Sequence, residues 1–234
     1  MTDQQQPARP ALVRGDETDC PVCGLGFAFA VARHYDVCAR CAWVDDPAAY
    51  ADPERKSETN DDSLSEAMRS WPKRLALRLA EAPLSTFAIT TRNDEIGGYD
   101  YLIDGVSARE LFPGGRRGLK ASIGPWRARR DWFGPLKSGL ANTPTGRSRL
   151  YVCHLCGGDD YEASITADLH VGTERVIWFR IGLETYNYES EGWDLDVRRG
   201  PAGFAFGAEE YRRVLRDAQH RVGSTRSVRA TDLP

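Results

Sequence analysis

The chain has 234 residues, a formal net charge of −3 at pH 7 and 41% hydrophobic residues. This length and apolar content suffice for one sizeable folded domain plus a small satellite, and they exclude a chain that is disordered throughout. The near-neutral charge gives no global reason to expect nucleic-acid or membrane binding, although it conceals local segregation of charge.

Residues 1–17 are predicted to form a disordered polar tail. They lack the basic-then-apolar order of a secretory signal, and no stretch of the chain approaches the roughly 20 apolar residues needed to cross a bilayer. The six cysteines fall in three C-x-x-C pairs, which in a protein without a leader favours metal binding over disulfides. We therefore expect a cytoplasmic protein with no membrane partner.

Two of the cysteine pairs lie close together near the start of the chain. Cys20 and Cys23 form the first pair, Cys38 and Cys41 form the second, and 14 residues separate them. Each pair can offer two thiolates to one tetrahedral ion, and Gly24 permits the tight turn that follows the first pair. The pattern predicts one structural Zn²⁺ per chain. Redox chemistry of a C-x-x-C dithiol and an iron centre are the competing interpretations.

The segment between these pairs is predicted to be a strand of a hairpin. Leu25, Phe27, Phe29 and Val31 alternate with small residues, as in a half-buried strand, and His34 would lie in the turn. The expected zinc-ribbon-like module covers residues 18–60. Four acidic residues follow the second pair and are interpreted as a solvated loop, with a turn-capping role as the alternative for the first two: Asp45, Asp46, Asp52 and Glu54.

The residues around the cysteines resemble a known family. Cys20-Pro-Val-Cys-Gly24, residues 35–47, Asn60 and Ser63-Leu-Ser-Glu-Ala67 are similar to the cysteine-rich CPCC family of small bacterial domains over about residues 18–72. Val44 stands where that family typically has Glu. The resemblance implies a zinc-ribbon-like fold without an established activity, and the occurrence of some relatives beside toxin and immunity genes suggests an immunity or antitoxin-like role.

A linker helix is predicted within residues 61–83. Ser63 and Glu66 have the spacing of a capping box, so the helix should begin at Leu64. Pro72 should kink or split it, and Pro83 should end it. Its apolar stripe would consist of Met68, Trp71, Leu75, Leu79 and Ala82.

Residues 84–222 are predicted to form an α+β domain with a mixed or antiparallel sheet and a C-terminal helix. A hairpin is expected around Gly172, a helix over residues 208–220, and a tail over 223–234. The expected strands are 86–91, 99–103, 150–152, 162–171, 175–183 and 203–206.

The third cysteine pair is predicted to form either a structural turn or a second metal site. Cys153 and Cys156 lack two further cysteines, so His154 and His170 would have to complete the ligand set. This segment, with residues 178–180 and 204–206, loosely resembles uncharacterised bacterial proteins. Those proteins tend to have another cysteine where Asp159 or Asp160 stands.

A basic loop is expected over residues 113–149, where Asp131 is the single acidic residue. Aromatic side chains between the cations suit phosphate contact with base stacking, and the alternatives are an acidic protein partner, internal docking or a solvated face. The candidate contact residues are Arg116, Arg117, Lys120, Trp126, Arg127, Arg129, Arg130 and Trp132.

These features together favour a non-enzymatic zinc-binding protein that acts through macromolecular interaction, with a protein as its partner. The four histidines offer little for nucleophilic or metal catalysis, and no phosphate-binding loop is found. Nucleic-acid binding by residues 113–149 is the first alternative. A redox or metal-dependent enzyme centred on Cys153 and Cys156 is the second.

Overall fold

The computed structural model describes residues 11–12, 16–91, 99–111, 119–121, 133–139, 143, 145–153, 163–197 and 201–230, and of residues 11–12, 119–121, 133–135, 153 and 222–230 only the backbone. The fold is α+β, as the sequence predicts. The helices are α1 (Pro47–Ala51), α2 (Leu64–Glu81), α3 (Ala108–Leu111), α4 (Phe133–Ser138) and α5 (Ala208–Ala230). The strands are β1 (Ala11–Leu12), β2 (Phe87–Thr91), β3 (Tyr99–Ile103), β4 (Val106–Ser107), β5 (Leu119–Ala121), β6 (Ser148–Cys153), β7 (Ala163–Val171), β8 (Arg175–Asn187), β9 (Gly192–Asp196) and β10 (Gly203–Gly207).

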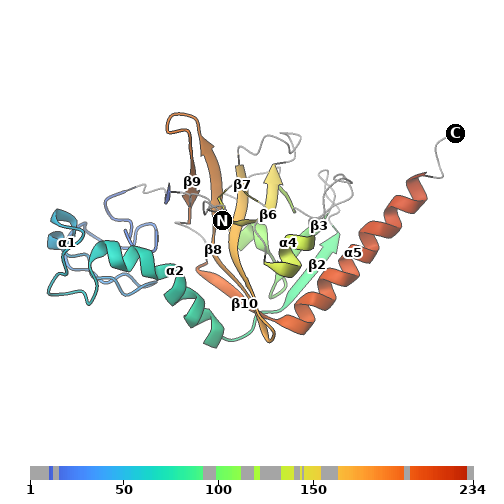
Figure 1. Cartoon of the computed structure of the whole chain (residues 1–234), viewed down its shortest axis with the longest axis horizontal. Helices are drawn as coiled ribbons and strands as arrows, with labels where there is room; N and C mark the ends of the chain where they lie inside the picture. Colours follow the sequence, from blue (N-terminus) through green and yellow to red (C-terminus); the bar gives the residue numbers. More distant parts are fainter. Residues whose placement is uncertain are drawn as a thin grey trace, which may run out of the picture.

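The main sheet is built from antiparallel neighbours with one parallel edge. Its order is β1-β9-β8-β7-β6-β5, with β10 also paired to β8, and β1 runs parallel to β9. The hairpin expected around Gly172 is confirmed, because Val171 pairs with Val176 across β7 and β8. A smaller sheet has the order β2-β3-β4, and Figure 1 shows α5 running beside β2.

An aromatic cluster forms the core between the main sheet, β2, β3 and α5. The ring centroids of Phe87 and Tyr211 lie 4.6 Å apart, and those of Trp178 and Phe206 lie 5.2 Å apart. The indole N–H of Trp178 donates to the Tyr211 hydroxyl over 3.2 Å, so this buried donor has an acceptor inside the core. This core anchors the start of α5 on the sheet.

A buried ionic network lies where β7 and β8 shift register. Arg147 is 2% exposed, and its guanidinium donates to the Thr166 hydroxyl at 2.8 Å and to Asp168 at 2.9 Å. Glu184 is 1% exposed and accepts the hydroxyls of Thr145 and Thr166 at 2.7 and 2.8 Å. The register shift falls between Thr166 and Asp168, so this network fastens an irregular point of the sheet.

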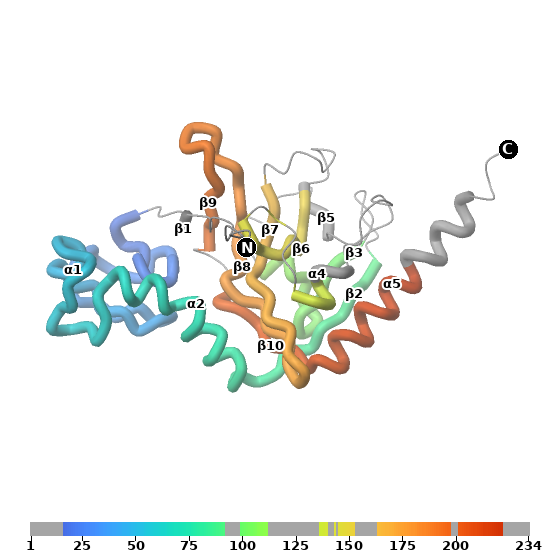
Figure 2. The backbone as a smooth tube through the Cα atoms, in the orientation of Figure 1, coloured from blue at the N-terminus to red at the C-terminus, as the bar shows by residue number. Residues whose placement is uncertain are grey.

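Helix α2 joins the N-terminal module to the sheet. The predicted capping box is confirmed: the Glu66 N–H donates to Ser63 Oγ at 3.2 Å, and the Ser63 N–H donates to Glu66 at 3.0 Å. The helix continues through Pro72 as one element, so the predicted split does not occur. Figure 2 shows α2 passing from the module toward β8 and β10.

The buried face of α2 belongs to a second core. Leu64, Ala67, Trp71 and Leu75 pack with the four cysteines of the module, and Phe179 of β8 and Ala202 are packed against the same cluster. Gly203 of β10 permits the close approach, because a Cβ there would lie 2.5 Å from Leu79 Cδ1. Helix α2 is therefore a packed element shared by both lobes and not a free linker.

Several expected elements differ from the structure. No strand forms between the two cysteine pairs; residues 25–31 make turns and bends in place of the predicted hairpin. Helix α5 runs to Ala230 and so includes much of the expected 223–234 tail, and β1 lies within the expected N-terminal tail. Strand β9 was not predicted. The β3–β4 turn was also missed, although its Asp104-Gly105 pair, with φ of 51° and 81°, is a strong hairpin signal.

None of the helices in the described part of the chain combines the length and the apolar character that a membrane crossing requires.

Candidate metal centre

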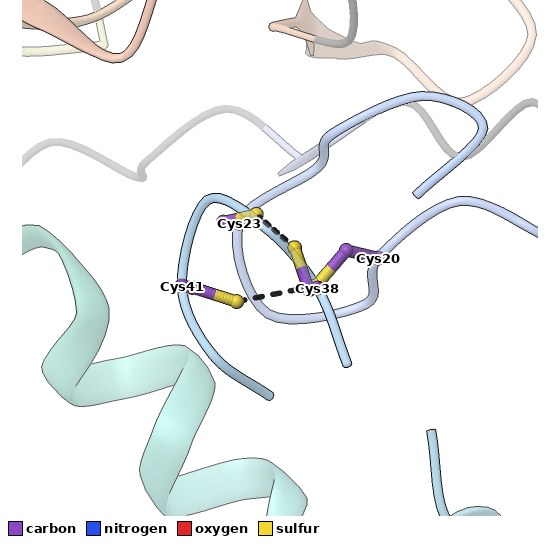
Figure 3. Close-up of side chains that lie close together, drawn as sticks. All are labelled: Cys20, Cys23, Cys38 and Cys41. Carbon is purple, nitrogen blue, oxygen red and sulfur yellow. Dashed lines mark hydrogen bonds between the residues drawn. The ribbon is translucent and has the colours of Figure 1, made fainter. Parts of the chain in front are cut away.

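The two N-terminal cysteine pairs adopt the same turn. The Gly24 N–H donates to the Cys20 carbonyl at 2.9 Å, and the Ala42 N–H donates to the Cys38 carbonyl at 2.8 Å. The residue after each pair has a left-handed backbone, with φ of 69° at Gly24 and 63° at Ala42. These equivalent turns let both sulfurs of each pair face the same point, as Figure 3 shows.

The four sulfur atoms form a compact group. Cys20 Sγ and Cys41 Sγ lie 3.4 Å apart, Cys23 Sγ and Cys38 Sγ lie 3.6 Å apart, and all four lie within 4.8 Å of one another. Four thiolates around one tetrahedral ion at about 2.3 Å would lie about 3.8 Å from each other. The observed spacing fits such an ion without rearrangement, so the group could hold a metal.

The four thiols strongly affect one another's protonation. Hydrogen bonds with the other three thiols, that of Cys23 first, together with burial, raise the pKa of Cys20 far above its ordinary value. Hydrogen bonds from the same neighbours, that of Cys20 first, lower the pKa of Cys38. Four adjacent thiols cannot all ionise beside one another, and a divalent cation removes that conflict by replacing the shared protons.

The site is closed to solvent. All four cysteines are buried and none of them is in a disulfide. Four protein ligands fill a tetrahedral coordination shell, so no position is left for a substrate. The arrangement is suited to holding a fold together.

Aspartate side chains hold the backbone of the loop between the cysteine pairs. Asp19 accepts the Phe27 N–H at 3.0 Å, Asp36 accepts the Ala30 N–H at 3.1 Å, and Asp45 accepts the Arg33 N–H. Asp45 is fully buried and also accepts the Tyr50 hydroxyl. The interpretation of Asp45 and Asp46 as a solvated loop is therefore wrong, because both side chains are buried and their carboxylates accept hydrogen bonds from the protein.

The capping alternative is correct for Asp46. Its carboxylate accepts the Ala48 N–H at 2.8 Å as the N-cap of α1 and the Thr59 hydroxyl at 2.7 Å. The Thr59 bond, and then the Ala48 bond, hold the pKa of Asp46 below its usual range. Asp52 and Glu54 are exposed, as expected.

Asn60 has a structural role. In the sequence, the only sign of this role was that Asn60 is among the residues similar to the CPCC family. Its side-chain amide donates to the Val44 carbonyl at 3.0 Å and accepts the Val44 N–H at 3.0 Å. One side chain thus bonds both the N–H and the carbonyl of Val44, as the backbone of a neighbouring β-strand would. Asn60 therefore ties the segment before α2 to the residues that follow the second cysteine pair.

The four-cysteine group lies beside the junction of the two lobes. Arg40 donates from Nη1 to the Val197 carbonyl at 3.3 Å, and Arg78 of α2 donates to the Arg40 carbonyl at 3.1 Å. Cys23, Arg40 and Arg180 line a void of about 10 Å³, which is the size of one water molecule.

The other predicted site residues are not brought together in the described part of the chain. Val152, next to Cys153, pairs with Ser164, whereas the exposed His170 lies six residues further along β7, or roughly 20 Å away. His154 and Cys156 lie outside the described residues. Of the basic candidates, Lys120 lies in β5 with only its backbone described, and Arg116, Arg117, Trp126, Arg127, Arg129, Arg130 and Trp132 lie outside the described residues.

Fold and site together define a buried four-cysteine module packed through α2 onto an α+β sheet lobe. Residues 18–77 match the model of the family described as "Cysteine-rich CPCC", which confirms the resemblance. This part of the chain is similar to that family, and the match ends within α2. Searches of curated proteins and of solved structures found no match.

Proposed function

We propose that the CPCC module holds one structural zinc ion and that the protein acts by contacting another macromolecule, without catalysis at the metal. The observation that carries this proposal is the closed group of four buried cysteine sulfurs. Tetrahedral coordination by four thiolates is typical of structural zinc sites, and zinc adds no redox chemistry of its own. An apparent binding energy of about 10–16 kcal/mol would dominate the stability of so small a module.

A protein is the partner that this arrangement favours. The module between the cysteine pairs presents large apolar side chains to solvent, and exposed apolar groups in a rigid segment are typical of protein contact surfaces. An immunity or antitoxin-like role, in which the partner is a toxin, would be one form of this function. Co-purification with the product of a neighbouring toxin-like gene would test that form directly.

Metal analysis of the purified full chain tests the metal part of the proposal. We expect one zinc per chain in the wild type and in the Cys156→Ser variant, and loss of zinc in Cys38→Ser. The Cys156→Ser variant is the matched control, because it removes a cysteine from the third pair. Two zinc ions per chain would assign metal to the third pair as well. Iron, or no metal at all, would contradict the proposal.

A further inference from the structure

The loop between the two cysteine pairs exposes an unusual concentration of apolar side chains. Among the described residues, eight large hydrophobic side chains are exposed, and four of them lie within residues 27–37. They are Phe27 (71% exposed), Val31 (54%), Tyr35 (57%) and Val37 (60%), here called the inter-knuckle surface. Single exposed hydrophobic residues are ordinary, but a cluster of four in one loop marks a contact surface.

The loop displays these side chains from a fixed backbone. The Ala30 N–H donates to Asp36 Oδ2, which brings the stretch carrying Val31 beside the stretch carrying Tyr35 and Val37. Val37 also forms an antiparallel bridge with Val44, and Cys38 continues directly into the metal centre. Rigid aromatic groups lose little conformational entropy on binding, so such a surface suits recognition.

The net negative charge of the module favours a positively charged partner. Residues 16–82 contain 13 acidic and 8 basic residues, and four thiolates around one divalent ion would add a further net charge of −2. Arg33, the cation within the loop, lies 3.8 Å from Glu17. Asp16 and Glu17 are exposed beside the loop. Nucleic acids and anionic membranes would be repelled here, whereas a cationic polypeptide would be attracted.

We propose that the inter-knuckle surface binds a polypeptide segment that carries both Arg or Lys residues and aromatic or aliphatic side chains. Phe27, Val31, Tyr35 and Val37 provide the apolar contact, and the surrounding carboxylates attract and orient the cations. This inference rests on the proposed function, since it names the surface and the partner chemistry for the contact that the zinc-bound module would make.

Binding of a defined probe peptide to the zinc-loaded full chain tests the inference. The probe is a fluorescein-labelled 16-residue peptide of alternating Arg and Trp or Leu residues, measured by fluorescence anisotropy. We expect saturable binding that weakens as salt rises. The double variant Tyr35→Ser/Val37→Ser should bind at least about 10-fold more weakly, because such contacts at an interface centre carry most of the affinity.

The chain offers matched controls for that variant. Tyr188 is 67% exposed and Leu77 is 60% exposed, both outside the inter-knuckle surface, so Tyr188→Ser/Leu77→Ser should bind like the wild type. A peptide with every Arg replaced by Glu, a peptide with every Trp and Leu replaced by Ser, and a 20-nucleotide single-stranded DNA should all bind much more weakly than the probe.

Equal affinity of the two double variants for the probe would overturn the inference, and so would DNA binding that displaces the probe from this loop. Zinc content and melting temperature, measured on the same samples, separate the two proposals. If the wild type holds one zinc but the probe does not bind, the inference fails and the metal proposal stands. If the wild type holds no zinc, the proposed function fails first.

Discussion

Ala42 and Gly24 occupy equivalent positions after the two cysteine pairs, but only one of them is glycine. Both have a left-handed backbone, which a Cβ atom makes unfavourable by roughly 1–2 kcal/mol. The glycine after the first pair could be assigned to this turn from the sequence. The second turn could not be recognised in that way, because alanine gives no signal for it.

We expect Ala42→Gly to raise the free energy of unfolding of the zinc-loaded protein by up to about 1 kcal/mol, because relief of backbone strain exceeds the entropy that glycine loses on folding. Gly24→Ala should lower it by about the same amount. Urea unfolding at fixed zinc concentration measures both. A destabilising effect of Ala42→Gly would show that the alanine side chain has a contact which outweighs the strain.

The role of one aspartate of the module could be predicted from the sequence, whereas the role of its neighbour could not. The place of Asp46 before Pro47 and a short helix agrees with its role as an N-cap. Asp45 gave no comparable signal, since its partners Arg33 and Tyr50 lie 12 residues before and 5 residues after it. Its burial depends on the conformation of the loop between the cysteine pairs, whose backbone Asp19 and Asp36 also bind.

Among the helices and strands, those whose sequence pattern agrees with their tertiary contacts were predicted well. Strand β3 coincides with the expected 99–103, and β8 starts at the expected residue but extends to Asn187 because β9 pairs with its end. Strand β9 alternates Trp193 and Leu195 with aspartates after a polar stretch, so it resembles a loop. In residues 25–31 the alternation indicated a strand, but carboxylate bonds to the backbone amides fix turns there.

The irregular pairing of β7 with β8 depends on Arg147. We expect Arg147→Ala to lower the free energy of unfolding by roughly 3–5 kcal/mol, because it leaves Glu184 buried without its cationic partner, 3.3 Å away. Arg213→Ala is the control: its pairs with Glu210 and Asp217 lie on the exposed face of α5, and the change should stay within about 0.5 kcal/mol. Urea unfolding followed by circular dichroism measures both. Similar losses in the two variants would argue against the buried network.

At the scale of the whole molecule, the four cysteines belong to one of two cores. The cysteines pack with Trp43, Trp71 and Leu75, whereas the aromatic cluster around Trp178 has its own contacts with the sheet and α5. The division into a cysteine module and an α+β lobe could be expected from the spacing of the cysteines and the later strands. The way in which the lobes pack could not, because it depends on long-range contacts of α2 with Phe179 and Ala202.

Removal of zinc with a chelator should therefore unfold the module and leave most of the sheet folded. We expect amide hydrogens of residues 16–82 to lose protection by at least about 100-fold, while those of β7 and β8 keep theirs, since each core opens separately when its support is removed. Hydrogen exchange with mass spectrometry resolves the two regions. Restored protection after zinc is added back is the control, and unchanged protection in residues 16–82 would show that the module folds without metal.

Because the buried face of α2 packs with the cysteines and also with Phe179 and Ala202 of the sheet lobe, a cut on either side of this helix would expose apolar surface. A fragment ending at residue 60 would leave the cysteine cluster without Leu64, Ala67 and Trp71. A fragment beginning at residue 84 would uncover Phe179 and Ala202, together with the glycine surface at Gly203 that receives Leu79. We therefore expect limited proteolysis to cut at few sites between the lobes. A change in evolution that added or removed the cysteine module would have had to add or remove α2 as well.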